Sequence, residues 1–226
     1  MVPPKYNFYI GTAVDIQFTG NTTIDVNGNI VTGSSNDYAC YKIALGTKKY
    51  IFIDVISEGQ SSNAIFFYSS SGSFISYIQL HSSYNGVIIK VPSNAAYYAL
   101  RFSEQGSNNF AAKKNTTFVY TLLNVNPHYK ELNKKYAKEN GQEFFRISLD
   151  GKINLFGYDY DLVKNSSLED RLVLIIDKYN STSDKWLEYY KGEFNKTDCK
   201  FDYEKRMCEV KTSALDEYNN IVNKYE

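Results

Sequence analysis

The fold class is decided by the stretch Thr23-Ile24-Asp25-Val26-Asn27-Gly28-Asn29-Ile30-Val31. Short runs rich in β-branched residues flank Asn27-Gly28, and an Asn-Gly pair between such runs is a strong signal for a hairpin turn. The stretch therefore predicts a β-hairpin in an all-β region.

Short β-branched and aromatic runs continue along the chain at intervals of roughly ten residues, separated by turn residues. Along Tyr50–Ile56 the alternate residues Ile51, Ile53 and Val55 are all apolar, so this face is the predicted core side. So many short strands predict a β-sandwich of jelly-roll type. The predicted strands are Tyr38–Leu45, Tyr50–Ile56, Ala64–Tyr68, Phe74–Leu80, Gly86–Val91, Tyr97–Phe102 and Thr117–Leu122.

The charges are distributed unevenly along the chain. The 226 residues include 25 basic and 25 acidic side chains, yet only 14 of these 50 charges fall in residues 1–125. A shift in composition of this size indicates two differently built domains, with a boundary near Pro127. We predict a mostly β protein with a jelly-roll-like sandwich over 1–125, a connector helix over 126–141 and a small α+β domain over 142–226.

The connector helix is predicted from one apolar stripe. Tyr129, Leu132 and Tyr136 follow helical spacing, and Gly141 provides a C-terminal stop. The segment contains too few heptads for a coiled-coil stalk.

The third segment mixes strand and helix signals. Asp150-Gly151 predicts the turn of a hairpin over Phe144–Leu155, and a short helix is expected to start near Asp159. Further predicted elements are strands at Arg171–Ile176, Trp186–Phe194 and Phe201–Val210, and a terminal helix at Ser213–Tyr225.

Residues able to carry out catalysis are sparse. His81 and His128 are the only histidines, and neither has a nucleophile and an acid near it in the sequence. Asp159 and Asp161 could form a carboxylate pair, but a position near a helix start, favoured by the helix dipole, is the preferred interpretation. No phosphate-binding or dinucleotide motif occurs. We therefore expect no enzyme activity, no cofactor and no metal site.

The overall charge and hydropathy restrict the partners. A net charge of zero argues against nucleic-acid binding, which needs a basic face. The longest apolar run, Ala95–Leu100, is too short to span a membrane. Neither partner class is expected.

The three cysteines support different interpretations. If Tyr203-Glu204 forms a two-residue turn, Cys199 and Cys208 lie directly opposite each other and can form a disulfide on oxidation. The alternative is a pair of reduced thiols on one hairpin face. Cys40, within an apolar strand, is interpreted as a small core residue.

Aromatic residues make up 16% of the chain. Most are expected in the core, but Tyr84, Tyr189 and Tyr190 are candidates for exposed rings. Exposed aromatic rings suit sugar rings or protein partners, and both alternatives stay open.

Two stretches of the sequence resemble known virion proteins. The first contains Ile65-Phe66-Phe67-Tyr68 and Val91-Pro92-Ser93-Asn94-Ala95-Ala96-Tyr97-Tyr98-Ala99-Leu100-Arg101. It resembles a jelly-roll-like module of bacteriophage tail-fibre and baseplate proteins. The second contains Trp186-Leu187-Glu188-Tyr189-Tyr190-Lys191-Gly192-Glu193-Phe194 and Thr197-Asp198-Cys199-Lys200-Phe201-Asp202. It is similar to a small domain of structural proteins of crAss-like phages of Bacteroidota.

The resemblance implies a non-enzymatic structural protein of the virion, in a tail, fibre or collar. The implied partners are other virion proteins and further copies of the chain, together with a host surface glycan if the protein takes part in attachment. The alternative is a secreted bacterial carbohydrate-binding protein. The resemblance identifies no binding residue.

Overall fold

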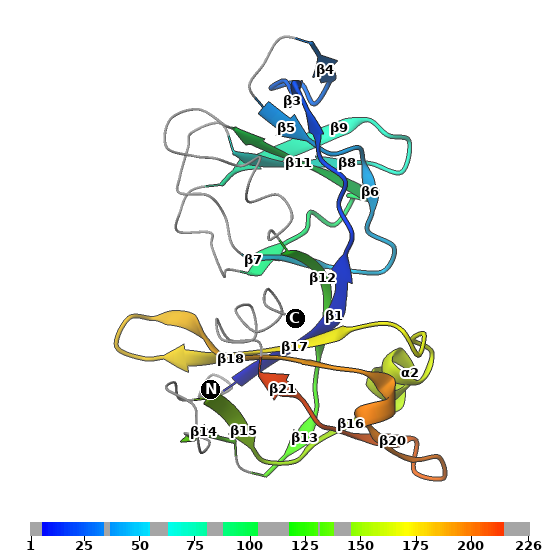
Figure 1. Ribbon diagram of the computed structural model, residues 1–226, viewed down its shortest axis with the longest axis vertical. Coiled ribbons are helices and arrows are strands. Elements are labelled where there is room, and N and C mark those ends of the chain that lie inside the picture. Colours follow the sequence, from blue (N-terminus) through cyan, green and yellow to red (C-terminus); the bar gives the residue numbers. More distant parts are fainter. Residues whose placement is uncertain are drawn as a thin grey trace. The chain divides into compact units, whose positions relative to one another are not determined.

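The computed structural model shows a mostly β protein (Figure 1). It describes residues 6–33, 37–54, 63–80, 88–103, 118–130, 132–137 and 146–214. The contacts between Cα atoms divide the chain into two compact units. We call residues 13–123 the sandwich unit, and residues 1–12 with 124–226 the charge-rich unit.

The sandwich unit contains two antiparallel sheets. One has the order β10-β7-β12 and the other the order β2-β5-β11-β8-β9, with β6 also paired to β11. The strands are β2 (Thr19–Gly20), β5 (Asp37–Ala39), β6 (Ile43–Ala44), β7 (Tyr50–Asp54), β8 (Ala64–Tyr68), β9 (Phe74–Gln79), β10 (Ile88–Lys90), β11 (Tyr97–Ser103) and β12 (Phe118–Val125).

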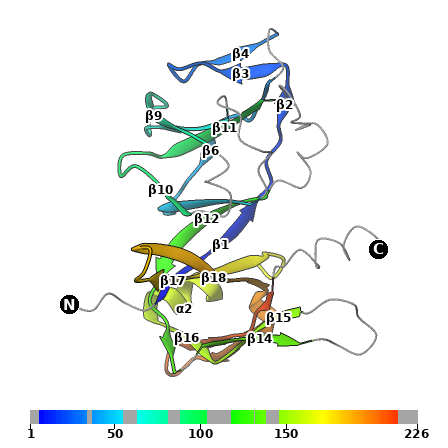
Figure 2. The same cartoon turned by 90° about the vertical axis from the view of Figure 1, so that its left-hand side faces the viewer.

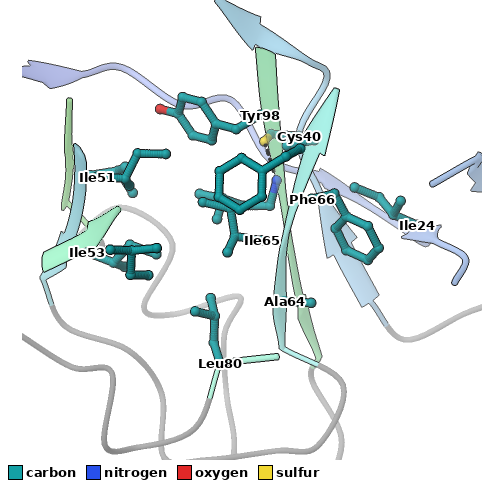
Figure 3. Close-up of a cluster of buried hydrophobic side chains, with 14 of the residues drawn as sticks. Ile24, Cys40, Ile51, Ile53, Ala64, Ile65, Phe66, Leu80 and Tyr98 are labelled. Carbon is teal, nitrogen blue, oxygen red and sulfur yellow. Dashed lines mark hydrogen bonds between the residues drawn. The ribbon is translucent and has the colours of Figure 1, made fainter. Parts of the chain in front are cut away.

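Most connections of this unit pass between its two sheets. From β6 onward, every connection except that between β8 and β9 passes from one sheet to the other. This alternation is typical of double-sheet jelly rolls. The predicted sandwich is therefore confirmed, and Ile51 and Ile53 lie in its core as predicted (Figure 3). Phe52, on the opposite face of the same strand, is buried as well, so β7 is covered on both sides.

A small hairpin covers the outer face of the larger sheet. It consists of β3 (Thr22–Ile24) and β4 (Ile30–Thr32), as predicted. Phe66 points toward Ile24 of this hairpin and away from the core between the sheets (Figure 3). The Tyr68 hydroxyl donates to the Gly28 carbonyl oxygen at 2.9 Å.

The turn of this hairpin is longer than the predicted Asn27-Gly28 pair. Five residues, Asp25–Asn29, connect the paired residues Ile24 and Ile30. The Asp25 carboxylate accepts hydrogen bonds from the backbone N–H groups of Asn27 and Asn29, at 2.9 and 2.8 Å. A short carboxylate that satisfies the turn's own amides favours this wider loop.

The charge-rich unit also contains antiparallel sheets and one helix. The sheet that carries its N-terminal strand has the order β1-β17-β18-β21, and a second sheet has the order β13-β16-β20-β19. Its elements are β1 (Tyr6–Val14), β13 (His128–Tyr129), β14 (Asn133–Ala137), β15 (Arg146–Asp150), β16 (Ile153–Phe156), α2 (Gly157–Lys164), β17 (Leu172–Asn180), β18 (Lys185–Phe194), η3 (Lys196–Asp198), β19 (Lys200–Asp202), β20 (Met207–Val210) and β21 (Ser213–Ala214).

The predicted connector helix over 126–141 is wrong for its described part. His128–Tyr129 form β13 and Asn133–Ala137 form β14, which pair with β16 and β15. The helical stripe is divided, because Tyr129 packs on the rings of Tyr6 and Phe8 whereas Tyr136 is exposed. Strand pairing satisfies this backbone and overrides the weak local pattern. Gly141 lies outside the described residues.

The predicted Asp150-Gly151 hairpin is also wrong. Asp150 ends β15, which pairs with β14 (Figure 2), whereas Ile153 begins β16, which pairs with β13 and β20 (Figure 1). Gly151 has φ 141°, a backbone region open mainly to glycine. Asp150-Gly151 therefore lies at a bend between the successive strands β15 and β16.

Other predictions for this unit hold. The short helix is α2, and the strands at Arg171–Ile176 and Trp186–Phe194 correspond to β17 and β18. The segment Phe201–Val210 forms the hairpin β19–β20. The predicted terminal helix is wrong at its start, because Ser213–Ala214 form β21 and pair with β18. Residues 215–226, the rest of that prediction, lie outside the described residues.

The contacts divide the chain at two places, whereas the sequence predicts a boundary only near the second of them. The chain passes between the units within β12, near Pro127, but it does so a first time within β1. β1 pairs with β17 from Tyr6↔Lys178 to Thr12↔Leu172. Residues 6–12 therefore belong with the charge-rich unit, and the sandwich unit is an insertion in its sequence.

Candidate functional site

A groove of about 830 Å³ lies where the chain bends between β13 and β14 and again between β15 and β16. We call it the bend groove. Its polar lining residues are His128, Lys130, Asn133, Asp150, Lys152 and Asn154. A volume in this range is typical of sites for small ligands.

The groove arises from a shift in strand register. Tyr129 pairs with Ile153, and Asn133 pairs with Asp150. Three residues lie between Tyr129 and Asn133, whereas only two residues lie between Asp150 and Ile153. The two pairs belong to separate sheets, so both segments bend between them and the polar residues at the ends of the strands lie close together.

Two ion pairs neutralise part of the charge around the groove. Lys135 Nζ lies 2.6 Å from Asp150 Oδ2, and Lys152 Nζ lies 3.0 Å from Glu209 Oε2. Lys130 has no ion pair within the part of the chain that the structure describes. Among the described lining residues, positive charge is therefore in surplus, centred on Lys130.

His128 connects the groove to an exposed aromatic side chain. It pairs with Asn154, so both residues lie on the outer face of the four-stranded sheet. The rings of His128 and Phe156 meet edge to face, with centroids 5.9 Å apart. The outer face therefore presents an imidazole, an amide and an apolar ring side by side.

A second exposed aromatic position lies on the β19–β20 turn. Tyr203 is 68% exposed and stacks on Phe201, with ring centroids 5.9 Å apart. The Lys164 ammonium group lies 5.8 Å from the Tyr203 ring centroid. These contacts hold the ring in place although the residue is largely exposed to solvent.

Asp159 and Asp161 have separate structural partners. Asp159 lies in the first turn of α2, as the dipole interpretation predicts, and its Oδ2 accepts from the Asn126 N–H at 2.9 Å. Asp161 forms an ion pair with Arg206. The two carboxylates therefore serve to attach neighbouring segments to α2.

The predicted direct opposition of Cys199 and Cys208 is wrong. The β19–β20 turn has four residues rather than two, and Phe201 lies opposite Cys208. Cys199 is diagonal to Cys208, a separation of roughly 7–8 Å between Cα atoms, which exceeds the usual disulfide range. Both cysteines are free thiols in the structure.

The environment of all three thiols disfavours the reactive thiolate. Burial raises the pKa of Cys199 to about 11 and that of Cys208 to about 12. Burial likewise raises the pKa of Cys40 to about 11, and its Sγ accepts a hydrogen bond from the Leu100 N–H. Cys40 is the buried core residue that the sequence predicts. Thiols of this kind are poor nucleophiles at neutral pH.

Of the three tyrosines proposed as exposed, the structure describes Tyr189 and Tyr190, and neither is among the strongly exposed ones. Tyr190 is buried, and the half-buried Tyr189 exchanges hydrogen bonds with the backbone of Leu132 and Lys134. Tyr84 and His81 lie outside the described residues. The strongly exposed tyrosines are Tyr41, Tyr136, Tyr158 and Tyr203.

Sequence reasoning missed the bend groove. Its polar residues come from two segments that are 20 residues or so apart in the chain and meet only through strand pairing. Within the described ranges, no group of three or more His, Cys, Asp or Glu side chains is placed to hold a metal ion. Within the same ranges, no helix is long and apolar enough to cross a membrane.

Comparison of the chain with known protein families, with curated proteins and with solved structures gives no match. The arrangement of its own residues is therefore the basis for a functional proposal.

Proposed function

We propose that the chain is a non-enzymatic structural protein of a bacteriophage particle that also contacts a glycan on the host surface. The observation that carries the binding part is the bend groove, in which amide and carboxylate groups lie on paired strands and the ammonium groups of Lys130 and Lys152 lie in the adjoining bends. Groups held on strands keep their geometry better than groups on loops, which favours recognition. The virion part rests on the sequence resemblance.

Exposed aromatic side chains support a role in assembly. Tyr158 and Tyr203 are 65% and 68% exposed. Tyr158 lies in α2, and Tyr203 lies on the turn between β19 and β20. Tyrosine is enriched in protein interfaces because its ring provides contact area and its hydroxyl a hydrogen bond. Other virion proteins and further copies of the chain are the proposed partners.

Particle association tests the virion part. The protein is quantified by mass spectrometry in phage particles purified by density gradient, and its location is examined with gold-labelled antibodies. We expect a fixed copy number per particle and an oligomer in light scattering. A protein found only as a free monomer would contradict this proposal.

The groove by itself also fits the second candidate, a secreted bacterial carbohydrate-binding protein. The two candidates differ in where the protein is found, since a secreted lectin-like protein accumulates in the culture medium without infection. A glycan array with the full chain tests the binding that both candidates share. A lack of binding to every host glycan on the array would favour a purely structural role.

A further inference from the structure

We infer that the bend groove is a binding site for an acidic saccharide, one that bears carboxylate groups. The inference deepens the proposed function and rests on it for the source of the ligand, but its physical basis is the groove itself. The basis has three parts: the kind of lining, the balance of charge and the position of the aromatic side chains.

The lining favours a ligand rich in hydroxyl groups. Asn133 and Asn154 each offer an amide donor and a carbonyl acceptor, and Asp150 adds a carboxylate acceptor. A sugar hydroxyl both donates and accepts, so it matches such a mixed set. An apolar ligand would instead leave these groups without partners at a considerable cost.

The charge favours an acidic ligand. Asp150 is already neutralised by Lys135, and Lys152 by Glu209. The Lys130 ammonium group remains to be matched, since no ion pair holds it within the described residues. A ligand carboxylate at Lys130 would complete the balance with a charge-assisted hydrogen bond.

The position of the aromatic side chains is compatible with a sugar ring. Tyr129 lines the groove, and its ring packs against the rings of Tyr6 and Phe8. His128 lies at the outer side and is held by Phe156. These neighbours fix both rings before any ligand arrives, which reduces the entropy lost on binding.

The test is a titration of the full chain followed by calorimetry and by ¹⁵N NMR. Three probes are compared: trigalacturonic acid, the neutral galactose trimer and a short polyglutamate peptide. We expect binding of the acidic trimer that is at least tenfold tighter than that of the neutral one, the effect of one charge-assisted contact. The expected shifts include the side-chain amide signals of Asn133 and Asn154.

Two variants locate the site. Lys130→Ala should weaken binding of trigalacturonic acid by about tenfold and leave binding of the neutral trimer almost unchanged. Lys185→Ala, which removes an exposed lysine of β18 outside the groove, is the matched control and should have no effect. Retained folding of both variants is checked by the NMR spectrum.

Several results would overturn the inference. These are equal binding of acidic and neutral trimers, no binding of any probe, an unchanged affinity in Lys130→Ala, or shifts confined to residues outside the groove. Tighter binding of polyglutamate would identify an acidic peptide as the ligand instead. A failure here with the protein present in particles overturns the saccharide site alone, whereas binding without particle association overturns only the virion proposal.

Discussion

Polar side chains serve different purposes in the two units. In the sandwich unit they attach the β3–β4 hairpin to the larger sheet. The Arg101 guanidinium donates to the Ile24 carbonyl oxygen, and the Tyr68 hydroxyl donates to the Gly28 carbonyl oxygen. In the charge-rich unit they form ion pairs at the surface, such as Lys205 with Asp202 and Arg206 with Asp161. Surface ion pairs contribute little to stability, so the charges of this unit are available for solubility and recognition.

The two cores resemble each other more than the surfaces do. The sandwich core is dominated by aromatic and aliphatic residues on facing sheets, and Tyr68 and Tyr98 are buried there. Each core contains a buried tyrosine with a polar partner: the Tyr68 hydroxyl donates to the Gly28 carbonyl oxygen, and the Tyr190 hydroxyl lies 2.8 Å from Thr212 Oγ1. We therefore expect the sandwich unit to be sensitive to packing and the charge-rich unit to be tolerant of surface changes.

The largest expected effect is that of Phe67→Ala in the sandwich core. Phe67 is fully buried, and its loss should lower the free energy of unfolding by about 3–5 kcal/mol. Urea unfolding is followed by far-UV circular dichroism and by the fluorescence of Trp186, the only tryptophan, which reports on the charge-rich unit. Val31→Ala, at an exposed site of the same unit, should change stability by less than about 0.5 kcal/mol. Equal losses in both probes would show one cooperative unit and contradict the comparison.

The next effect is that of Gly28→Ala in the β3–β4 turn. Gly28 has φ 78°, and a Cβ there would lie 2.5 Å from Phe74, so strain and a clash add to about 2–4 kcal/mol of destabilisation. Gly46→Ala is the matched control, because φ is 56° there and no atom lies within 4 Å of the added Cβ. It should cost only about 1–2 kcal/mol. Similar thermal unfolding midpoints for both variants would exclude the clash.

A smaller effect of opposite sign is expected for Asp177→Asn on β17. Burial first, and then the Glu188 carboxylate paired with it across the strands, raises the pKa of Asp177 to about 6. Because the folded state holds this proton more tightly, stability should fall as the pH rises from about 4 to about 6. At neutral pH the variant should be more stable by on the order of 1 kcal/mol, after allowance for solvent screening.

Urea unfolding at pH 4.5 and at pH 7.5, followed by Trp186 fluorescence, measures this difference. Glu188→Gln is the control and should produce a weaker change of the same sign, since it removes only the second cause. An Asp177→Asn protein with an unaltered pH profile would contradict the assignment.

The smallest effect is expected at Arg206. This residue has φ 46°, and its side chain pairs with Asp161 at the surface. In Arg206→Gly the relief of backbone strain and the loss of the ion pair oppose each other, so the net change should be less than about 1 kcal/mol. Arg206→Ala loses the ion pair without relief and should be the less stable of the two. A large loss in either variant would mean that the charge-rich unit depends on its surface charges after all.

The sequence predicts those elements whose signals are local. The strand at Ala64–Tyr68 is found with the same limits, since it is a short apolar run between turn residues. The short helix near Asp159 is likewise found as α2, residues 157–164. Alternation and turn residues are sufficient for such elements.

The sequence does not predict features that depend on distant pairing. Nothing near Tyr6–Val14 indicates that this strand pairs with β17, more than 150 residues away. For the same reason the connector segment resembles a helix until β16 is placed beside β13. The polar residues of the bend groove become a site only through that pairing, so residue spacing could not identify them.

The insertion of the sandwich unit between β1 and β13 determines the order in which parts of the protein can fold during synthesis. Residues 13–123 are complete when barely half of the chain has been made, and domains generally fold as they emerge. β1 is made first, yet its partner β17 is made some 160 residues later. During that interval the edge of β1 that pairs with β17 lacks its partner, and such an open edge is prone to pair with other chains. A fragment that ends near Pro127 would keep this edge of β1 open, whereas a fragment that begins after Thr12 would not.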